Sequence, residues 1–109
     1  MLFTDFSAGG KDYKLRLSTR AVVELEKKLG CNPLGIFKDE NTIPPVTTMV
    51  NILHAALLQM HHGVTLAGAM DIFDEWLADG HTVTEFFPVI IDIYKCSGII
   101  GDAEENGKN

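Results

Sequence analysis

The four histidines are the residues of this chain whose chemistry is simplest to recognise, because imidazole binds metals and transfers protons. His54 and His61 stand seven residues apart, two turns along one face of a predicted helix. A metal site on a helix needs ligands three or four residues apart, together with a carboxylate or a thiolate. His54 has no such partner, and His61 and His62 suit the negative end of a helix dipole. We therefore predict no metal and no cofactor.

A cluster of acidic residues precedes Gly80. Asp71, Asp74, Glu75 and Asp79 are three or four residues apart, which places them on one side of a helix. Paired carboxylates can act as general acid and base, but such a face is more typical of a side that is turned to water. A negatively charged docking face is the second interpretation, and catalysis is the weakest.

The two cysteines also indicate no reaction. Cys31 and Cys96 stand outside any CxxC pair, and neither has a pattern of basic neighbours that specifies an activated thiolate, since Lys95 before Cys96 is a weak signal. We expect both to be reduced, buried and inert, although a disulfide depends on a distance that the sequence does not contain. The sequence also lacks the motifs GxxxxGK[ST], GxGxxG and GxSxG. We predict that the protein is not an enzyme.

The composition favours proteins as partners. The chain has 109 residues, a hydrophobic fraction of 46% and a formal net charge of −6. This length supports one domain with its own core. The acidic balance argues against binding to nucleic-acid phosphates or to anionic membranes. Because no apolar run is long enough to span a bilayer and no secretory signal is evident, we expect a cytoplasmic protein.

The elements that must position these residues begin with a β-hairpin within residues 1–17. Residues 2–6 and 12–17 are the predicted strands, joined by a turn at residues 8–11 that contains two glycines. A lone hairpin is marginal in water, so its apolar face must pack on helices.

Helical spacing of apolar residues, with capping residues before and glycines after, recurs along the remaining chain. A short turn is predicted from Asn32-Pro33, and Ser18 or Thr19 can cap the first helix. The first predicted helix lies within residues 17–30, and the others cover residues 46–62, 65–79 and 82–97.

Details of three helices can be predicted. The helix at 46–62 has the widest apolar face, so we expect it to be the most buried. Thr82 and Glu85 form a capping box, and Pro88 should either kink the last helix or delay its start by a turn. The predicted apolar stripe of the helix at 65–79 consists of Leu66, Ala69, Met70, Phe73 and Leu77.

The expected fold class is therefore mostly α. We predict a small single-domain helical bundle of four to five helices, with the N-terminal hairpin, over residues 1–100. Residues 101–109 are too polar to bury anything and should form a disordered tail.

The last helix suggests a partner-binding surface, because its apolar side chains cover nearly the whole circumference. Either this helix is central, or part of its surface meets another chain. A tryptophan at the edge of the preceding helix is either packed at the edge of the core or an interface anchor. The predicted partner-binding residues are Trp76, Phe86, Phe87, Ile90, Tyr94, Ile99 and Ile100.

Four segments resemble the tail assembly chaperones of long-tailed bacteriophages and of their prophage and gene-transfer-agent relatives. The lead-in at 13–19 precedes a helix at 21–30 that has a Leu-Glu pair and a terminal glycine. The small-residue block at 52–57 and the junction at 63–67, where a helix begins at a threonine, complete the resemblance.

The resemblance implies a non-enzymatic protein that binds the long, hydrophobic tape-measure protein and keeps it soluble until tail-tube subunits polymerise around it. Such chaperones are commonly absent from the mature particle. The resemblance also allows contact with the tail-tube protein and self-association. Many occur in a second, longer form made by −1 frameshifting, and Gly107-Lys108-Asn109 can be encoded by a slippery heptamer. The alternative is a structural component of the particle, such as a minor tail or head–tail connector protein.

Overall fold

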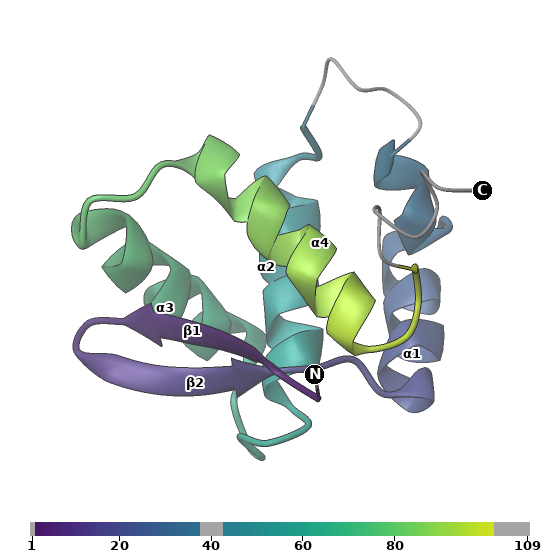
Figure 1. The fold of residues 1–109 in the computed structure, drawn as a ribbon, viewed down its shortest axis with the longest axis horizontal. Coiled ribbons are helices and arrows are strands. Elements are labelled where there is room, and N and C mark those ends of the chain that lie inside the picture. The colour runs from purple at the N-terminus through teal and green to yellow at the C-terminus, as the bar shows by residue number, and fades with distance from the viewer. Residues whose placement is uncertain (1, 38–42, 102–109) are drawn as a thin grey trace.

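The computed structural model describes residues 2–37 and 43–101, and it begins with a tight hairpin (Figure 1). Strand β1 (Thr4–Ala8) pairs with the antiparallel strand β2 (Lys11–Leu15), with Ala8 opposite Lys11. Only Gly9 and Gly10 form the turn, and their φ angles of 60° and 80° are the positive values that such a two-residue turn requires. The strands therefore extend closer to the turn than the predicted ranges 2–6 and 12–17.

The hairpin has one buried face. Phe6, Ala8 and Leu15 are buried, while the residues between them along β1 are exposed. This alternation is the period of two that a strand imposes on its side chains. Because two strands alone cannot exclude water, the buried face packs against the helices that follow.

Helices make up most of the remaining described chain, which confirms the predicted fold class of a mostly helical domain with an N-terminal hairpin. The elements are α1 (Thr19–Leu29), the 3-10 helix η1 (Pro33–Phe37), α2 (Val46–Leu57), α3 (Leu66–Ala78), the 3-10 helix η2 (Val83–Glu85) and α4 (Phe86–Cys96). The predicted tail lies outside the described residues from 102 onward, as do residues 38–42 of the loop before α2.

Local sequence signals set most helix ends. The Ser18 hydroxyl accepts a hydrogen bond from the Ala21 amide at 3.1 Å, and the Thr65 hydroxyl accepts one from the Gly68 amide at 3.0 Å. These bonds satisfy amides that have no partner within the helix. Gly30 ends α1 with a φ of 70°, a conformation that glycine adopts without a steric penalty.

The end of α2 differs from the prediction. The helix stops at Leu57 and not at residue 62, so His61 and His62 do not lie at its C-terminus. In the turns that follow, His61 Nε2 accepts a hydrogen bond from the Lys14 amide at 3.1 Å. Its ring also meets the Tyr13 ring edge-on, with 5.2 Å between centroids. A bond to the hairpin, which is distant in sequence, has replaced the predicted helical turn.

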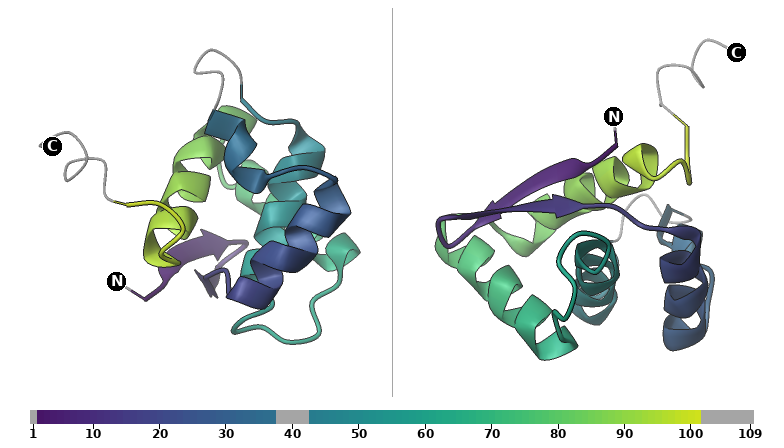
Figure 2. Two further views of the ribbon diagram at one scale, coloured as in Figure 1. Left: turned by 90° about the vertical axis from the view of Figure 1, so that its right-hand side faces the viewer. Right: turned by 90° about the horizontal axis from the view of Figure 1, so that it is seen from below.

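Helix α2 is the centre of the molecule, as its apolar face predicted. It contacts α1, α3, α4 and β2, and α4 crosses in front of it in Figure 1. Figure 2 shows α2 between α1 and α3, with the hairpin and α4 together over one side. The opposite side of α2 is the side that these elements leave uncovered.

Helix α3 is rotated relative to the predicted stripe. Ile72 and Trp76 are buried together with Ala69 and Phe73, whereas Met70 is 44% exposed. Leu66 and Leu77 lie at the edge of the core. The aromatic ring of Trp76 can fill the space beneath the hairpin, and this packing decides which side of α3 faces inward.

Pro88 delays the start of the last helix, which is one of the two predicted alternatives. The 3-10 turn η2 precedes α4, so that Pro88 falls in the first turn of α4, where no amide donor is needed. The predicted capping box is present, with the Glu85 carboxylate accepting from the Thr82 amide at 2.7 Å.

This capping box predicts a pH dependence. The hydrogen bond from the Thr82 amide, supported by the Thr82 hydroxyl and by His81, lowers the pKa of Glu85 below its ordinary value of 4.5. The folded state therefore gains stability above the unfolded pKa and loses it as the pH falls through the lower, folded pKa. We expect wild type to unfold at a higher temperature than Glu85→Gln at pH 6 and the difference to shrink as the pH falls below 4.5. Thermal unfolding of both proteins at several pH values measures this difference in unfolding temperature. A difference that does not change with pH would contradict the prediction.

Candidate interaction surface

Four of the seven predicted partner-binding residues belong to the core. Phe86, Ile90 and Tyr94 are fully buried, and Trp76 is 5% exposed. The Phe86 ring lies 5.1 Å from the Phe73 ring and 5.6 Å from the Trp76 ring, in edge-to-face contacts. In this structure these four side chains pack against the rest of the chain, so they are not exposed to a partner.

The other three residues are half-buried and lie apart from one another. Phe87 is in the first turn of α4, whereas Ile99 and Ile100 follow the far end of that helix. The Ile99 amide donates to the Tyr94 carbonyl at 2.9 Å, and both isoleucines pack against the core. The Tyr94 hydroxyl in turn donates to the Pro33 carbonyl at 3.2 Å and so holds η1 in place. These residues do not form one exposed surface.

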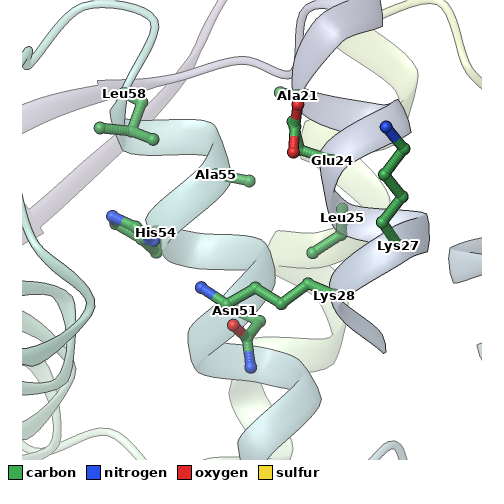
Figure 3. A pocket seen from close by; sticks show the side chains of 9 residues that line it. All are labelled: Ala21, Glu24, Leu25, Lys27, Lys28, Asn51, His54, Ala55 and Leu58. Carbon is green, nitrogen blue, oxygen red and sulfur yellow. The ribbon is translucent and has the colours of Figure 1, made fainter. Parts of the chain in front are cut away.

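A different surface lies along the uncovered side of α2, and we call it the α2 groove. Its floor consists of Thr47, Asn51, His54, Ala55 and Leu58, which follow one another at helical spacing. A hollow of about 470 Å³ separates this floor from α1 (Figure 3), and a second hollow of about 330 Å³ separates it from α3.

Apolar side chains dominate the lining of the α2 groove. Val46, Leu58 and Met70 are large apolar side chains that remain 47%, 38% and 44% exposed, and each lines one of the two hollows. Ala21 and Ala55 keep the space between α1 and α2 open, because neither side chain extends beyond Cβ. Exposed apolar side chains gathered in a concave surface are typical of a site that receives another molecule.

Charged residues border the two sides of the groove differently. Glu24, Lys27 and Lys28 line the hollow on the α1 side, and Asp74 lines the hollow on the α3 side. In Figure 3 the Lys28 side chain extends from α1 toward α2 and passes in front of Asn51. The groove therefore has a mainly apolar lining between a mixed rim that carries two lysines and an acidic rim.

Three of the five floor side chains are polar, and two of them, His54 and Asn51, form side-chain hydrogen bonds of different kinds. His54 Nε2 lies 2.8 Å from the Val64 carbonyl, and since a carbonyl only accepts, this nitrogen carries the proton. Asn51 is 6% exposed, and its Nδ2 donates to the Thr47 carbonyl at 2.7 Å. Its Oδ1 is buried without a hydrogen-bond partner. Sequence reasoning missed Asn51, because an asparagine on an apolar helix gives no sign of which atom stays unpaired.

The unpaired carbonyl of Asn51 predicts the effect of an apolar replacement. Leucine is similar in size and leaves no polar atom buried without a partner, a change that is nearly neutral or stabilising in such sites. We expect Asn51→Leu to change the free energy of unfolding by between zero and about +1 kcal/mol, measured by urea denaturation. A loss of more than about 1 kcal/mol would show that the fold itself requires the amide.

The acidic residues that precede Gly80 are exposed. Asp71, Asp74 and Glu75 are exposed, as the interpretation of a water-facing side predicts, and Asp79 accepts from the Gly9 amide at 2.9 Å. Within residues 2–37 and 43–101, no three histidine, cysteine, aspartate or glutamate side chains gather as metal ligands would.

Both cysteines are free, as expected, but the prediction that they are buried is wrong. Cys31 is exposed, in the short connection between α1 and η1, where little of the chain covers it. Cys96 is half-buried at the end of α4, with its Sγ 3.4 Å from the Thr4 hydroxyl.

Comparison with known proteins gives one match. The family described as a family of unknown function (DUF6096) matches residues 4–108. No curated protein and no solved structure matches the chain. Among the described helices, none combines the length and the apolar character needed to cross a membrane.

Proposed function

The chain belongs to DUF6096, a family of unknown function, and we propose that it is a non-enzymatic tail assembly chaperone that binds a tape-measure protein through the α2 groove. The observation that carries this proposal is the groove itself, a hollowed and mainly apolar surface along α2 between two flanking helices. A protein that shields apolar helices of a partner needs such a surface and needs no catalytic residues.

The dimensions and lining of the groove suit an α-helix as the ligand. The 12 residues of α2 give a floor about 18 Å long, which corresponds to about three turns of a bound helix. Ala55 at the floor allows close approach, and Leu58 and Met70 offer apolar contact on either side. Recognition of an amphipathic helix in a groove uses apolar residues at this spacing.

The charge of the chain supports the solubilising part of the proposal. The formal net charge is −6, and α3 turns Asp71, Asp74 and Glu75 to the outside. When the groove covers an apolar stripe of the partner, the complex exposes these charged side chains to water and no longer exposes the apolar stripe. Like charges on neighbouring complexes then oppose aggregation.

Co-expression with the tape-measure protein encoded in the same genome tests the proposal. We expect the soluble fraction of the tape-measure protein to rise and the two proteins to purify together. Leu58→Asp should abolish both effects, because it places a charge in the groove. Met60→Asp is the matched control, since Met60 is 46% exposed but does not line either hollow.

Two results would contradict the proposal. The first is an unchanged soluble fraction with no co-purification. The second is recovery of the protein from purified particles in amounts comparable to known tail subunits, which would identify a structural component instead. Mass spectrometry of the particles makes this second comparison.

A further inference from the structure

We infer that Asn51 selects bound helices that carry a neutral hydrogen-bond donor within their apolar stripe. This inference rests on the helix-binding part of the proposed function, but not on the identity of the partner. It gives the α2 groove a specificity, whereas apolar contact alone would accept any amphipathic helix.

The position of Asn51 is the first argument. It lines both hollows and so stands at the middle of the groove floor, between the α1 side and the α3 side. Asn51 is only 6% exposed. Its Oδ1 is buried, and the described residues supply no hydrogen-bond partner for it. Met49, Ile52 and Leu53 beside it on α2 are fully buried and apolar.

The energetics of an unpaired carbonyl are the second argument. A buried acceptor without a donor destabilises the free protein, and a donor brought by a ligand removes that penalty. The Nδ2 group is already bonded to the Thr47 carbonyl, which orients the amide and leaves Oδ1 for a different group. A helical ligand uses its backbone amides internally, so the donor must be a side chain.

The surroundings of Asn51 limit the chemistry of that donor. A carboxylate only accepts hydrogen bonds at neutral pH, so aspartate and glutamate do not fit. Lys28 extends toward this part of the floor in Figure 3, and its charge would repel an incoming lysine or arginine. Neutral donors remain, among them the side chains of serine, threonine, asparagine and glutamine. Because Lys28 is exposed, its flexible side chain can shift along the rim while its charge stays beside the groove.

A library of designed amphipathic helices of about 20 residues tests this inference without a natural partner. The members share one apolar stripe, in which each central position is varied between serine, glutamine, glutamate, lysine, alanine and leucine. We expect selection on wild type to enrich serine or glutamine at one stripe position. Selection on Asn51→Leu should enrich alanine or leucine at that same position.

Affinities of a matched peptide pair give the size of the effect. The enriched peptide and its version with alanine at the selected position are compared by fluorescence anisotropy on both proteins. Wild type should prefer the donor peptide by roughly 10-fold, and Asn51→Leu should prefer the alanine peptide. Leu58→Asp should weaken both peptides, whereas Met60→Asp should change neither.

Three results would overturn the inference: no binding of any library member, the same enriched residue on both proteins, or equal losses for both peptides. If the tape-measure protein is nevertheless solubilised, the chaperone proposal stands and only the role of Asn51 fails. If the peptides follow the predicted preference but no tape-measure protein is bound, the groove is a helix-binding site with a different partner.

Discussion

Phe86→Ala is expected to destabilise the fold by about 3–5 kcal/mol, which is a large part of the stability of a domain of this size. Phe86 is fully buried, and its ring lies 5.1–6.0 Å from the rings of Phe6, Phe73 and Trp76. These rings come from β1, α3 and α4, so the truncation leaves a cavity where the hairpin meets two helices. Urea denaturation measures the loss, and the midpoint should fall without a change in slope.

Phe3→Ala is the matched control for this prediction. Phe3 is a half-buried phenylalanine before β1, outside the buried core. Its truncation should cost about 1 kcal/mol or less. Equal losses for the two variants would mean that Phe86 is not enclosed and would restore it as a candidate for partner contact.

Leu53→Ala is expected to destabilise the protein by about 2–5 kcal/mol, whereas Leu58→Ala should cost no more than about 1 kcal/mol. Both leucines belong to the same helical segment, but Leu53 is fully buried and Leu58 is 38% exposed in the groove. The removed atoms are identical, so the difference reports burial alone. Thermal and urea unfolding of the two variants measure it.

The same pair separates stability from binding. Leu58→Ala should fold like wild type and yet bind the tape-measure protein, or a library helix, more weakly, because it removes apolar contact from the groove. Leu53→Ala should retain its affinity under conditions in which it remains folded. An unchanged affinity for Leu58→Ala would contradict the placement of the binding surface.

The groove and the core use different faces of one helix. Residues 52, 53, 56 and 57 of α2 are fully buried in the core, and residues 51, 54, 55 and 58 line the hollow on the α1 side. Substitutions in the second set can therefore change partner choice with little effect on folding. This separation makes Asn51→Leu informative. We expect the substitution to leave stability unchanged or slightly raised, and to reverse the preference between the donor peptide and the alanine peptide.

The sequence by itself determined the local features of the fold. Two adjacent glycines predicted the hairpin turn, Ser18 and Thr65 predicted helix starts, and Gly30 predicted a helix end. Each of these signals acts through bonds or backbone angles within a few residues, so neighbouring positions contain all the information. The overall class followed from the period of the apolar residues, which is also local.

Only the tertiary structure decided which surfaces are covered. The apolar circumference of α4 allowed both a central helix and an exposed one, and contacts with β1 and α2 bury the side that carries Phe86, Ile90, Ile93 and Tyr94. The rotation of α3 and the end of α2 depended on Trp76 beneath the hairpin and on His61 bonded to Lys14. The unpaired carbonyl of Asn51 is likewise defined by what surrounds it. These features arise between residues that are distant in sequence, and their energies depend on which surfaces meet, so no local pattern specifies them.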